Sequence, residues 1–340
     1  MSALRVAWVS FAPVERTANG FTSAVASVRY RVTSTAAALS RAGVECKVTY
    51  LGPGANRRTM LERFRNVDAV VLGKLFAPPE AFNRVLAFAL ELIAQLRAQK
   101  IAVLADYSDD HFAHALLGPG YRSLANAVDR VTASTPGMAQ VIRQHTSVPV
   151  SVVTDLVEGS RREARVAERS PLRLLWFGHP VNLDTLKYGL PQIERAGVPY
   201  ALTLLTAPAV DAQQAAADIR ARFRAWSTSA LFEELGACDA VIIPSNPYDP
   251  HKAVKSPNRF AETVWAGRLA LAHPLPAYEA LAEGGWVGED LGEGLKWYAA
   301  SPAAALQRIR DGQDLIARRH SPETIAGMWK RVIEETCAAP

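Results

Sequence analysis

The sequence predicts an α/β protein made of two similar halves, each with a parallel β-sheet covered by helices. Short, nearly unbroken apolar runs alternate with longer helical stretches, which is typical of parallel strands that are buried on both faces. The alternation stops in a charged stretch without aromatic residues at 156–170 and then restarts. The 340 residues are enough for two domains of ordinary size.

The first half is expected to form one such sheet. The predicted strands are short runs rich in aliphatic and β-branched residues: Leu4–Ser10, Glu45–Tyr50, Ala69–Leu72, Ile101–Ala105, Arg130–Ala133 and Val150–Val153. Helices are expected between them at Ser27–Ala42, Pro79–Gln99 and Pro136–Gln144. Proline at the first position of the last two is typical of a helix start.

The second half repeats the pattern. Strands are predicted at Arg173–Phe177, Ala201–Thr206, Ala240–Pro244 and Leu269–Ala272, and helices at Asp211–Ala225, Ser229–Leu235, Pro257–Ala266 and Ala303–Arg319. A final amphipathic helix, Pro322–Thr336, follows Ser321 as its N-cap. Ligands of such sheets bind outside the carboxyl ends of the strands, so the cleft between two facing halves is the expected site.

Composition and motifs exclude several classes of protein. No apolar run reaches the roughly 18 residues that a membrane-spanning helix needs. Three scattered cysteines, Cys46, Cys238 and Cys337, fit a reducing cytoplasm, which is the expected location. No GxGxxG follows the first strand and no P-loop, GxSxG or HExxH motif occurs. We therefore expect no dinucleotide cofactor and no metal site, with a cation at the acidic run Asp106–His111 as the alternative.

The positive charge is concentrated in the first half. The chain carries a net charge of +5: residues 1–165 hold 20 Lys and Arg against 13 Asp and Glu, and residues 166–340 hold 18 against 20. A basic half often faces an anionic partner, such as phosphate, nucleic acid or an acidic membrane. The alternative is an ordinary Arg-rich surface. One basic cluster is compatible with peripheral contact with an anionic membrane at its inner face, and also with a solvated face: Arg57, Arg58, Arg63 and Arg65, with Leu61 and Phe64 between them.

The helix predicted at 257–266 has the properties of an anion site. Ser256 is expected to cap it, Pro257 to be its first residue and Gly267 to close it, and Ser256 and Asn258 are expected to contact the bound anion. Free backbone N–H groups and the helix dipole favour negative charge at such a start.

Three charged residues around this helix start suit a nucleoside diphosphate. Lys255 and Arg259 would clamp the diphosphate, and Glu262, one turn beyond Arg259, would accept hydrogen bonds from the ribose hydroxyls. The alternative is a surface helix with an ordinary Arg259–Glu262 pair.

This region resembles the donor-binding segment of the group 1 (retaining, GT-B fold) glycosyltransferases. The likeness lies in a buried strand, a polar loop, Lys-Ser-x-x-Arg-x-x-Glu at 255–262, and a glycine before the next strand. Leu174–His179 is similar to the glycine-ended strand that opens the family's second domain, and Asp129–Met138 to a strand and helix of its first domain. The terminal helix with Trp329 resembles the one that crosses back to the first domain.

The resemblance implies a GT-B fold with two facing Rossmann-like domains. Residues 1–158 would bind the acceptor and residues 171–320 the nucleotide sugar, while 321–340 would return to the first domain. The activity implied is retaining, metal-independent transfer of a hexose from a nucleotide-diphosphate sugar to a glycan, lipid-linked or other acceptor. No cofactor is expected, since the nucleotide sugar is a substrate.

Further residues of the second half are expected at the donor. Gly178 would let the backbone approach the diphosphate, with His179 and Asn182 following it; the alternative is a plain strand-to-helix turn. Trp226 falls where the family lines its base pocket, although a tryptophan of the core would show the same pattern.

In the first half, Arg29 and Arg31 would hold an anionic acceptor or the donor phosphate, or lie on the surface. Asp110 and His111 follow a buried strand, where the family places a residue close to the reacting sugar, so we expect them to be catalytic. If the reaction inverts configuration, Asp110 or Asp109 would be the general base. A pair of loop-capping aspartates is the alternative.

The sequence departs from the family at one position. The family often carries Glu-x7-Glu, and Val254 stands where the first glutamate would be. Sugar contact would then fall to backbone amides of the loop 248–254, to Asp249 or to His251. Three other functions stay open: a glycosyltransferase acting on nucleic acid, a nucleotide-sugar epimerase, and a non-catalytic protein that binds a nucleotide sugar.

Overall fold

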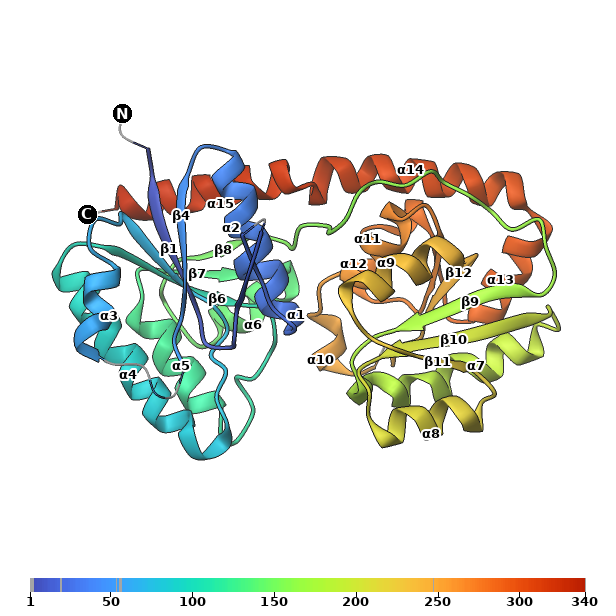
Figure 1. The fold of residues 1–340 in the computed structure, drawn as a ribbon, viewed down its shortest axis with the longest axis horizontal. Coiled ribbons are helices and arrows are strands. Elements are labelled where there is room, and N and C mark those ends of the chain that lie inside the picture. The colour runs from blue at the N-terminus through green and yellow to red at the C-terminus, as the bar shows by residue number, and fades with distance from the viewer. Residues whose placement is uncertain (1–2, 19, 53, 55–56, 247, 340) are drawn as a thin grey trace. The chain divides into compact units, whose positions relative to one another are not determined.

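The chain forms two compact units in a computed structural model that describes residues 3–18, 20–52, 54, 57–246 and 248–339. The first unit comprises Met1–Leu156, Val254–Ser256 and His320–Pro340, and the second comprises Val157–Ala253 and Pro257–Arg319. Each contains a six-stranded parallel sheet with helices on both faces, as expected for a GT-B fold (Figure 1). The grouping of Val254–Ser256 with the first unit was not expected from the sequence.

The sheet of the first unit has the order β4-β1-β5-β6-β7-β8, and all its pairs are parallel. Its strands are β1 (Arg5–Ser10), β4 (Glu45–Tyr50), β5 (Ala69–Leu72), β6 (Ala102–Tyr107), β7 (Arg130–Ala133) and β8 (Val150–Val152). One face packs against α3 (Arg57–Arg63), α4 (Pro79–Ala98), α5 (Gly118–Ala127) and α6 (Pro136–Arg143). The other packs against α1 (Ala26–Val28), η1 (Arg29–Thr33), α2 (Ser34–Arg41) and α15 (Pro322–Cys337).

The last helix, α15, belongs to the core of the first unit. It lies beside α2 and β6, and Ser321 caps it by accepting a hydrogen bond from the backbone N–H of Thr324 (Figure 1). Trp329 is fully buried, with its ring centroid 4.8 Å from that of Trp8 in an edge-on arrangement. Burying two tryptophans at this contact is worth several kcal/mol, so α15 is an integral part of the unit.

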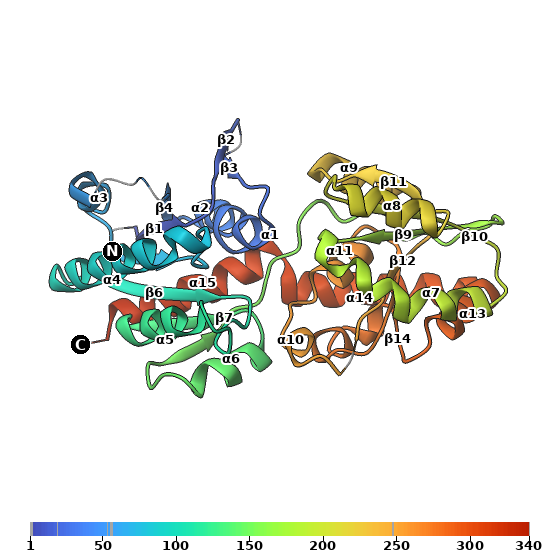
Figure 2. The same cartoon turned by 90° about the horizontal axis from the view of Figure 1, so that it is seen from below.

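A small hairpin follows β1 and was not predicted. Its strands, β2 (Glu15–Thr17) and β3 (Gly20–Thr22), pair antiparallel and project from the unit (Figure 2). All residues of β2 are exposed, so no alternation of apolar and polar residues marks the hairpin in the sequence.

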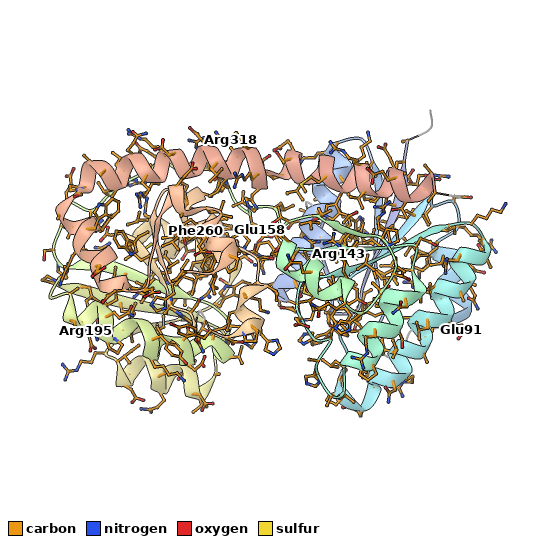
Figure 3. The ribbon with its side chains drawn as sticks, turned by 180° about the vertical axis from the view of Figure 1, so that it is seen from behind. Glu91, Arg143, Glu158, Arg195, Phe260 and Arg318 are labelled. Carbon is orange, nitrogen blue, oxygen red and sulfur yellow. The ribbon has the colours of Figure 1, made fainter. Side chains whose placement is uncertain are left out.

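The sheet of the second unit has the order β11-β10-β9-β12-β13-β14, also entirely parallel. Its strands are β9 (Leu172–Phe177), β10 (Tyr200–Thr206), β11 (Arg222–Ala225), β12 (Ala240–Ile243), β13 (Leu269–Ala272) and β14 (Trp286–Val287). One face packs against α9 (Thr228–Ala237), α11 (Asn258–Trp265) and α12 (Pro276–Glu279), and Phe260 of α11 is fully buried there (Figure 3).

The other face of this sheet packs against η2 (Pro180–Thr185), α7 (Leu186–Arg195), α8 (Val210–Asp218) and α13 (Leu291–Ala300). The long helix α14 (Pro302–His320) contributes side chains to both cores. Two short helical segments, α10 (Pro250–Ala253) and η3 (Ala282–Gly284), complete the unit.

Gly267 ends α11 as the sequence predicts. Its φ is +74°, and the N–H of Arg268 donates to the carbonyl of Thr263, which closes the last turn. A Cβ at Gly267 would also lie 2.2 Å from the carbonyl oxygen of Glu163, so two constraints require glycine.

One predicted helix was partly wrong. The helix expected at Asp211–Ala225 ends at Asp218, because Arg220 adopts a left-handed φ of +53° and the chain turns into the edge strand β11. Among the described residues, no helix combines the length and hydropathy needed to cross a membrane, and the three cysteines are free.

Candidate functional site

The strand order of the second unit marks a ligand site before any side chain is considered. From β9 the chain moves first to β10 and β11 on one side and then to β12 on the other, so the order reverses between β9 and β12. Ligands of open parallel sheets bind at the carboxyl ends of the strands at such a reversal. The two segments at this point begin with Gly178 after β9 and with Pro244 and Ser245 after β12.

Arg259 lies next to Gly178, as the sequence interpretation requires. A Cβ placed on Gly178 would be 3.7 Å from Nη1 of Arg259. This Nη1 is buried and has no hydrogen-bond partner among the described residues. An unused guanidinium donor beside a glycine backbone offers the positive charge and the hydrogen bond that a phosphate oxygen accepts.

The start of α11 differs from the prediction. The helix begins at Asn258, with Pro257 at the N-cap position and no side-chain cap hydrogen bond. The predicted Ser256 cap was therefore wrong: Pro257 has φ −80° and ψ 18°, and Ser256 groups with the first unit. Backbone N–H groups of the first turn remain oriented along the helix, which preserves the positive end of the dipole.

Glu262 is placed one turn after Arg259 on the same helix. Its side chain is buried at 3% exposure, whereas Arg259 is half-buried. Burying a carboxylate is costly unless it forms hydrogen bonds, so an acid at this position indicates a specific polar role. Contact between Glu262 and a ribose stays a prediction.

The segment after β9 carries His179 and Asn182. The Nδ1 atom of His179 accepts a hydrogen bond from the N–H of Val181 at 3.2 Å, so a neutral ring carries its proton on Nε2. The side-chain oxygen of Asn182 accepts from Nζ of Lys252 at 2.6 Å. Lys252, which the sequence reasoning did not select, thus holds α10 against the segment that follows β9.

Trp226 packs at the end of β11. It is half-buried against the core around α9 and α11, and its backbone N–H donates to the carbonyl of Thr206 at 2.8 Å. The hydroxyl of Thr206 is itself buried and has no hydrogen-bond partner in the described part of the chain. Sequence reasoning missed Thr206, because one polar residue at the end of a buried strand is not informative until its partners are known.

A buried histidine fixes the segment after β12, and it also was not predicted. Nε2 of His273 lies 2.9 Å from the side-chain oxygen of Gln192, and that oxygen also accepts from the N–H of Leu291. Its Nδ1 lies 3.0 Å from the backbone nitrogen and 2.8 Å from the carbonyl oxygen of Ser245, so the ring bridges Gln192 and the segment after β12. Burial lowers the pKa of His273, in keeping with a neutral ring.

In the first unit, two lysines converge on Asp109 beyond the end of β6. Nζ of Lys74, after β5, lies 2.5 Å from one carboxylate oxygen, and Lys255 donates to the other. Lys255 thus pairs with the first unit, whereas Arg259 belongs to the second. Their joint clamp on a diphosphate stays a prediction.

The charge of Asp109 is fixed by these neighbours. Burial by itself would raise the pKa of Asp109, but Lys74 and Lys255 lower it well below its usual range. Asp109 is therefore ionised at neutral pH and is a poor general base.

His111 and Asp110 lie in the same loop. Burial, and then the charge of Lys74, lower the pKa of His111 to about 4, so its ring is neutral at pH 7. The ring lies edge-on to Tyr121, with centroids 5.3 Å apart. One carboxylate oxygen of Asp110 accepts the N–H of Phe112 at 3.0 Å, which is the loop-capping arrangement that the sequence left open.

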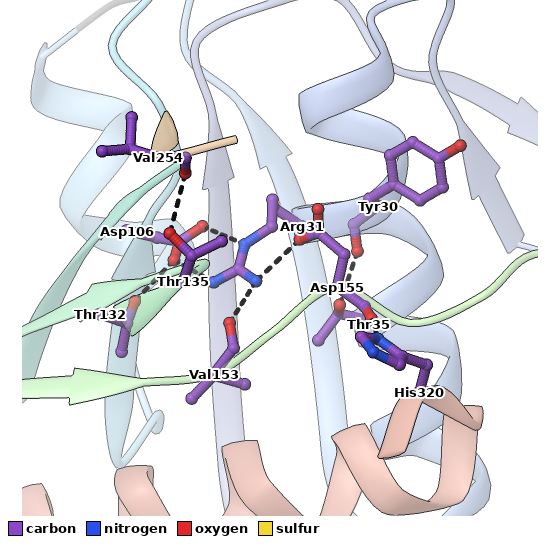
Figure 4. A network of polar contacts seen from close by, with 10 residues as sticks. All are labelled: Tyr30, Arg31, Thr35, Asp106, Thr132, Thr135, Val153, Asp155, Val254 and His320. Atoms are coloured by element: carbon purple, nitrogen blue, oxygen red, sulfur yellow. Dashed lines mark hydrogen bonds and ion pairs between the residues drawn. The ribbon is translucent and has the colours of Figure 1, made fainter. Parts of the chain in front are cut away.

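Arg31 is an interior residue with its donors already engaged (Figure 4). Its side chain is 3% exposed; Nε and Nη2 donate to Asp106 at 2.9 and 2.5 Å, and Nη1 donates to Asp155 at 2.9 Å and to the carbonyl of Val153 at 2.5 Å. Surface placement was therefore wrong for Arg31. Arg29 is 5% exposed, with its guanidinium 4.9 Å from the ring centroid of Tyr30, so it too is interior.

The same network holds further segments of the first unit. Thr132 donates to Asp106 at 2.6 Å, and the ring Nδ1 of His320 lies 2.9 Å from the carbonyl of Asp155 (Figure 4). Phosphate binding by Arg31 would require it to leave two buried carboxylates, so its primary role is structural.

Val254, which stands where the family has a glutamate, is a core residue of the first unit. It is 6% exposed within the apolar cluster, and its carbonyl accepts a hydrogen bond from Thr135 at 2.8 Å (Figure 4). An apolar side chain suits this place, because a carboxylate there would lose its hydration. In the preceding loop, Asp249 caps α10 through the N–H of His251 at 2.9 Å, and Tyr248 is 88% exposed.

The apolar residues of the basic cluster around α3 pack in the core of the first unit and do not face outward. Phe64 is 1% exposed in the core and Leu61 packs against the same core, while Arg63 and Arg65 are exposed. The side chains of Arg57 and Arg58 lie outside the described residues. Within the described ranges, no three His, Cys, Asp or Glu side chains are grouped as metal ligands.

Comparison with solved structures identifies the fold. The chain is similar to HepE of Anabaena in complex with UDP and glucose, with a TM-score of 0.69, 10% identity, and coverage of 98% of this chain and 100% of that one. It is also similar to a glycosyltransferase from Rickettsia africae, with a TM-score of 0.70 and 9% identity over the full length of both chains.

A third similar structure is the lipopolysaccharide outer core galactosyltransferase WaaB, with a TM-score of 0.65, 12% identity, and coverage of 98% of this chain and 99% of that one. No protein-family model and no curated protein matches the sequence. Similarities at 9–12% identity establish the GT-B fold and leave the function to be argued from the site.

Proposed function

We propose that the chain is a glycosyltransferase that moves a sugar from a nucleotide-diphosphate sugar to an acceptor. The observation that carries the proposal is the unused, buried Nη1 of Arg259 beside Gly178, at the strand reversal of the second sheet. HepE, with the same fold, was solved with UDP and with UDP-glucose. A uridine diphosphate sugar is therefore the first donor to test.

The two units would divide the work. The second would bind the donor, with Arg259 and the start of α11 on the diphosphate and Glu262 on the ribose. The first would bind the acceptor near the carboxyl ends of β5 and β6, where Asp110 and His111 lie. A neutral His111 can exchange one hydrogen bond with a sugar hydroxyl without adding charge.

Charge stabilisation would be the main catalytic effect. As the glycosidic bond breaks, negative charge grows on the leaving diphosphate, and Arg259 and Lys255 offer cations to meet it. Because side chains of this chain can supply the positive charge, we propose a reaction that needs no metal. Retention of configuration is proposed on the family resemblance.

Nucleotide binding is the direct test. Thermal unfolding should be recorded with UDP, GDP, ADP and CDP and with their sugars, followed by product analysis with candidate acceptors. A ligand at one hundred times its Kd stabilises the folded state by about 2.7 kcal/mol, which raises the Tm by several degrees. If no nucleotide and no nucleotide sugar raises the Tm, the proposal is contradicted.

The ribose role of Glu262 has a sharper test. We expect the native protein to bind UDP roughly tenfold more tightly than 2′-deoxy-UDP, because a hydrogen bond to a carboxylate is worth about 1.5–3 kcal/mol. Glu262→Gln keeps the shape and should remove most of this preference. An unchanged preference in the variant would exclude the role.

Val254 favours a second candidate, a nucleotide-sugar-binding protein without transferase activity. A buried valine stands where the family has a glutamate near the transferred sugar. This candidate shares the nucleotide affinity and differs in turnover. Normal UDP-sugar affinity, with neither transfer nor hydrolysis across an acceptor panel, would favour it over the enzyme.

A further inference from the structure

Asp109 holds two lysines that come from different segments of the first unit. Lys74 follows β5, Asp109 follows β6, and Lys255 lies 146 residues further along the chain. Each ammonium group contacts a different carboxylate oxygen. The three side chains form one cluster at the carboxyl edge of the sheet, where this fold class binds ligands.

The cluster is more positive than a simple ion pair. Two ammonium groups share one carboxylate, and the side chain of Lys74 is 24% exposed while that of Asp109 is 17% exposed. His111 adds no charge at pH 7, because burial and Lys74 lower its pKa to about 4. The neighbouring Asp110 directs one oxygen to the N–H of Phe112.

The shape of the cluster suits exchange of one anion for another. A carboxylate offers two oxygens about as far apart as two oxygens of a phosphate, and both accept from ammonium donors. Each lysine has a long, flexible stem, so its ammonium group can move to a new acceptor without a change in the backbone. Lys255 also lies only four residues before Arg259 in the chain.

We propose that Asp109 is an internal counter-anion that occupies a two-lysine phosphate site, and that a phosphate group of the substrate displaces it. Lys74 is then a second phosphate-binding lysine beside Lys255. The proposal rests on the proposed function for the identity of the substrate. Asp109 holds both lysines in place between turnovers and lowers the affinity for the phosphate that replaces it.

The first experiment measures UDP affinity by calorimetry in the native protein and in Asp109→Asn. Removing the competing charge should tighten UDP binding roughly three- to tenfold and steepen its dependence on salt. Asp68→Asn is the matched control. Asp68 lies just before β5 in the same unit and forms an ion pair with Arg5. Its substitution changes the net charge by the same amount and should leave the UDP affinity unchanged.

The second experiment uses Lys74→Met, which leaves Asp109 paired with Lys255 and therefore keeps a folded cluster. UDP and inorganic pyrophosphate should each bind roughly three- to tenfold more weakly than to the native protein. Lys47→Met, which removes an exposed lysine of β4, is its control and should change neither affinity.

Two results would overturn the proposal: unchanged or weaker UDP binding in Asp109→Asn, or native affinity in Lys74→Met. Failure of the proposed function has a different signature, because no nucleotide would then bind the native protein. Pyrophosphate titration of the same variants would still decide whether Asp109 competes with phosphate.

Discussion

Arg31 of the first unit and Arg259 of the second differ in how their guanidinium donors are used. In the first unit, Arg31 donates to two buried carboxylates and a backbone carbonyl (Figure 4). In the second, Arg259 has a buried Nη1, and Thr206 a buried hydroxyl, without a hydrogen-bond partner among the described residues. The contrast therefore lies between these two arginines and not between whole sheet edges, because the first unit also has buried hydroxyls without a partner among the described residues, at Ser108 and Ser134.

This difference separates residues that maintain the fold from residues that bind ligands. A buried donor satisfied by the protein costs energy to release, so it is a poor place for a substrate. A buried donor without a protein partner has already lost water, and a ligand oxygen repays that cost. The sequence allowed phosphate binding by both Arg31 and Arg259, and the hydrogen-bond partners of their donors distinguish the two.

The largest expected effect is on stability, and it comes from removing the guanidinium of Arg31 from its two carboxylates. Arg31→Met should lower the free energy of unfolding by about 3–5 kcal/mol, because it leaves Asp106 and Asp155 buried without their cation. Urea denaturation measures this change. Arg97→Met, which breaks the more exposed pair with Asp129, should cost at most about 1 kcal/mol, and equal losses in the two variants would remove the distinction.

The second effect is on UDP binding, and it comes from removing the guanidinium of Arg259. Arg259→Met should weaken UDP binding roughly ten- to a hundredfold, since a charge-assisted hydrogen bond is worth about 1.5–3 kcal/mol. Its thermal stability without ligand should change little. Arg195→Met removes a mostly exposed cation of the same unit and should bind UDP normally; loss of affinity in both variants would indicate a general charge effect.

Two buried threonines at the strand ends allow a matched comparison. Thr132 donates to Asp106 at 2.6 Å, whereas the hydroxyl of Thr206 has no partner among the described residues. Replacing each with valine should therefore lower the free energy of unfolding by about 1.5–3 kcal/mol at Thr132 and raise it by about 1 kcal/mol at Thr206. Urea midpoints that shift in the same direction in both variants would contradict the distinction between a hydroxyl with a hydrogen-bond partner and one without.

The smallest expected effect is the change of folding stability with pH, which depends on one histidine in each unit. Burial is the main cause that lowers the pKa of His111, to about 4, and of His273 from the ordinary 6.5. The unfolded chain then binds more protons than the folded one below about pH 6.5, so stability should fall as the pH drops from 6.5 towards 4. Urea midpoints at several pH values should show a shallower fall in His111→Gln and His273→Gln than in the native protein.

Much of the fold could be predicted because its signals are local. Glu45–Tyr50, Ala69–Leu72, Arg130–Ala133 and Leu269–Ala272 are strands with the predicted bounds, since each is a short apolar or β-branched run between turn residues. Gly267 was predicted as a helix end for the same reason. Of the missed elements, β2 is fully exposed and α7 contains Pro191, whereas α13 carries a local signal that was overlooked, a cap at Asp290 with Glu293 three residues later.

The candidate site could be predicted in part. The helix of Arg259 and Glu262 was found from spacing, and the structure places Arg259 beside Gly178. Thr206 and His273 were missed, because a single polar residue after a buried strand has meaning only when its partners are known.

The sequence by itself determined the two α/β halves, the strand-loop-helix segment around residue 259 and the charge that favours a diphosphate. Only the tertiary structure decided which charges are already neutralised: Arg31 on Asp106 and Asp155, and Lys255 on Asp109. The physical reason is one of range. Periodicity and helix capping act over a few residues, whereas the burial and pairing of a charge depend on distant side chains, such as Lys255 and Asp109, which are 146 positions apart.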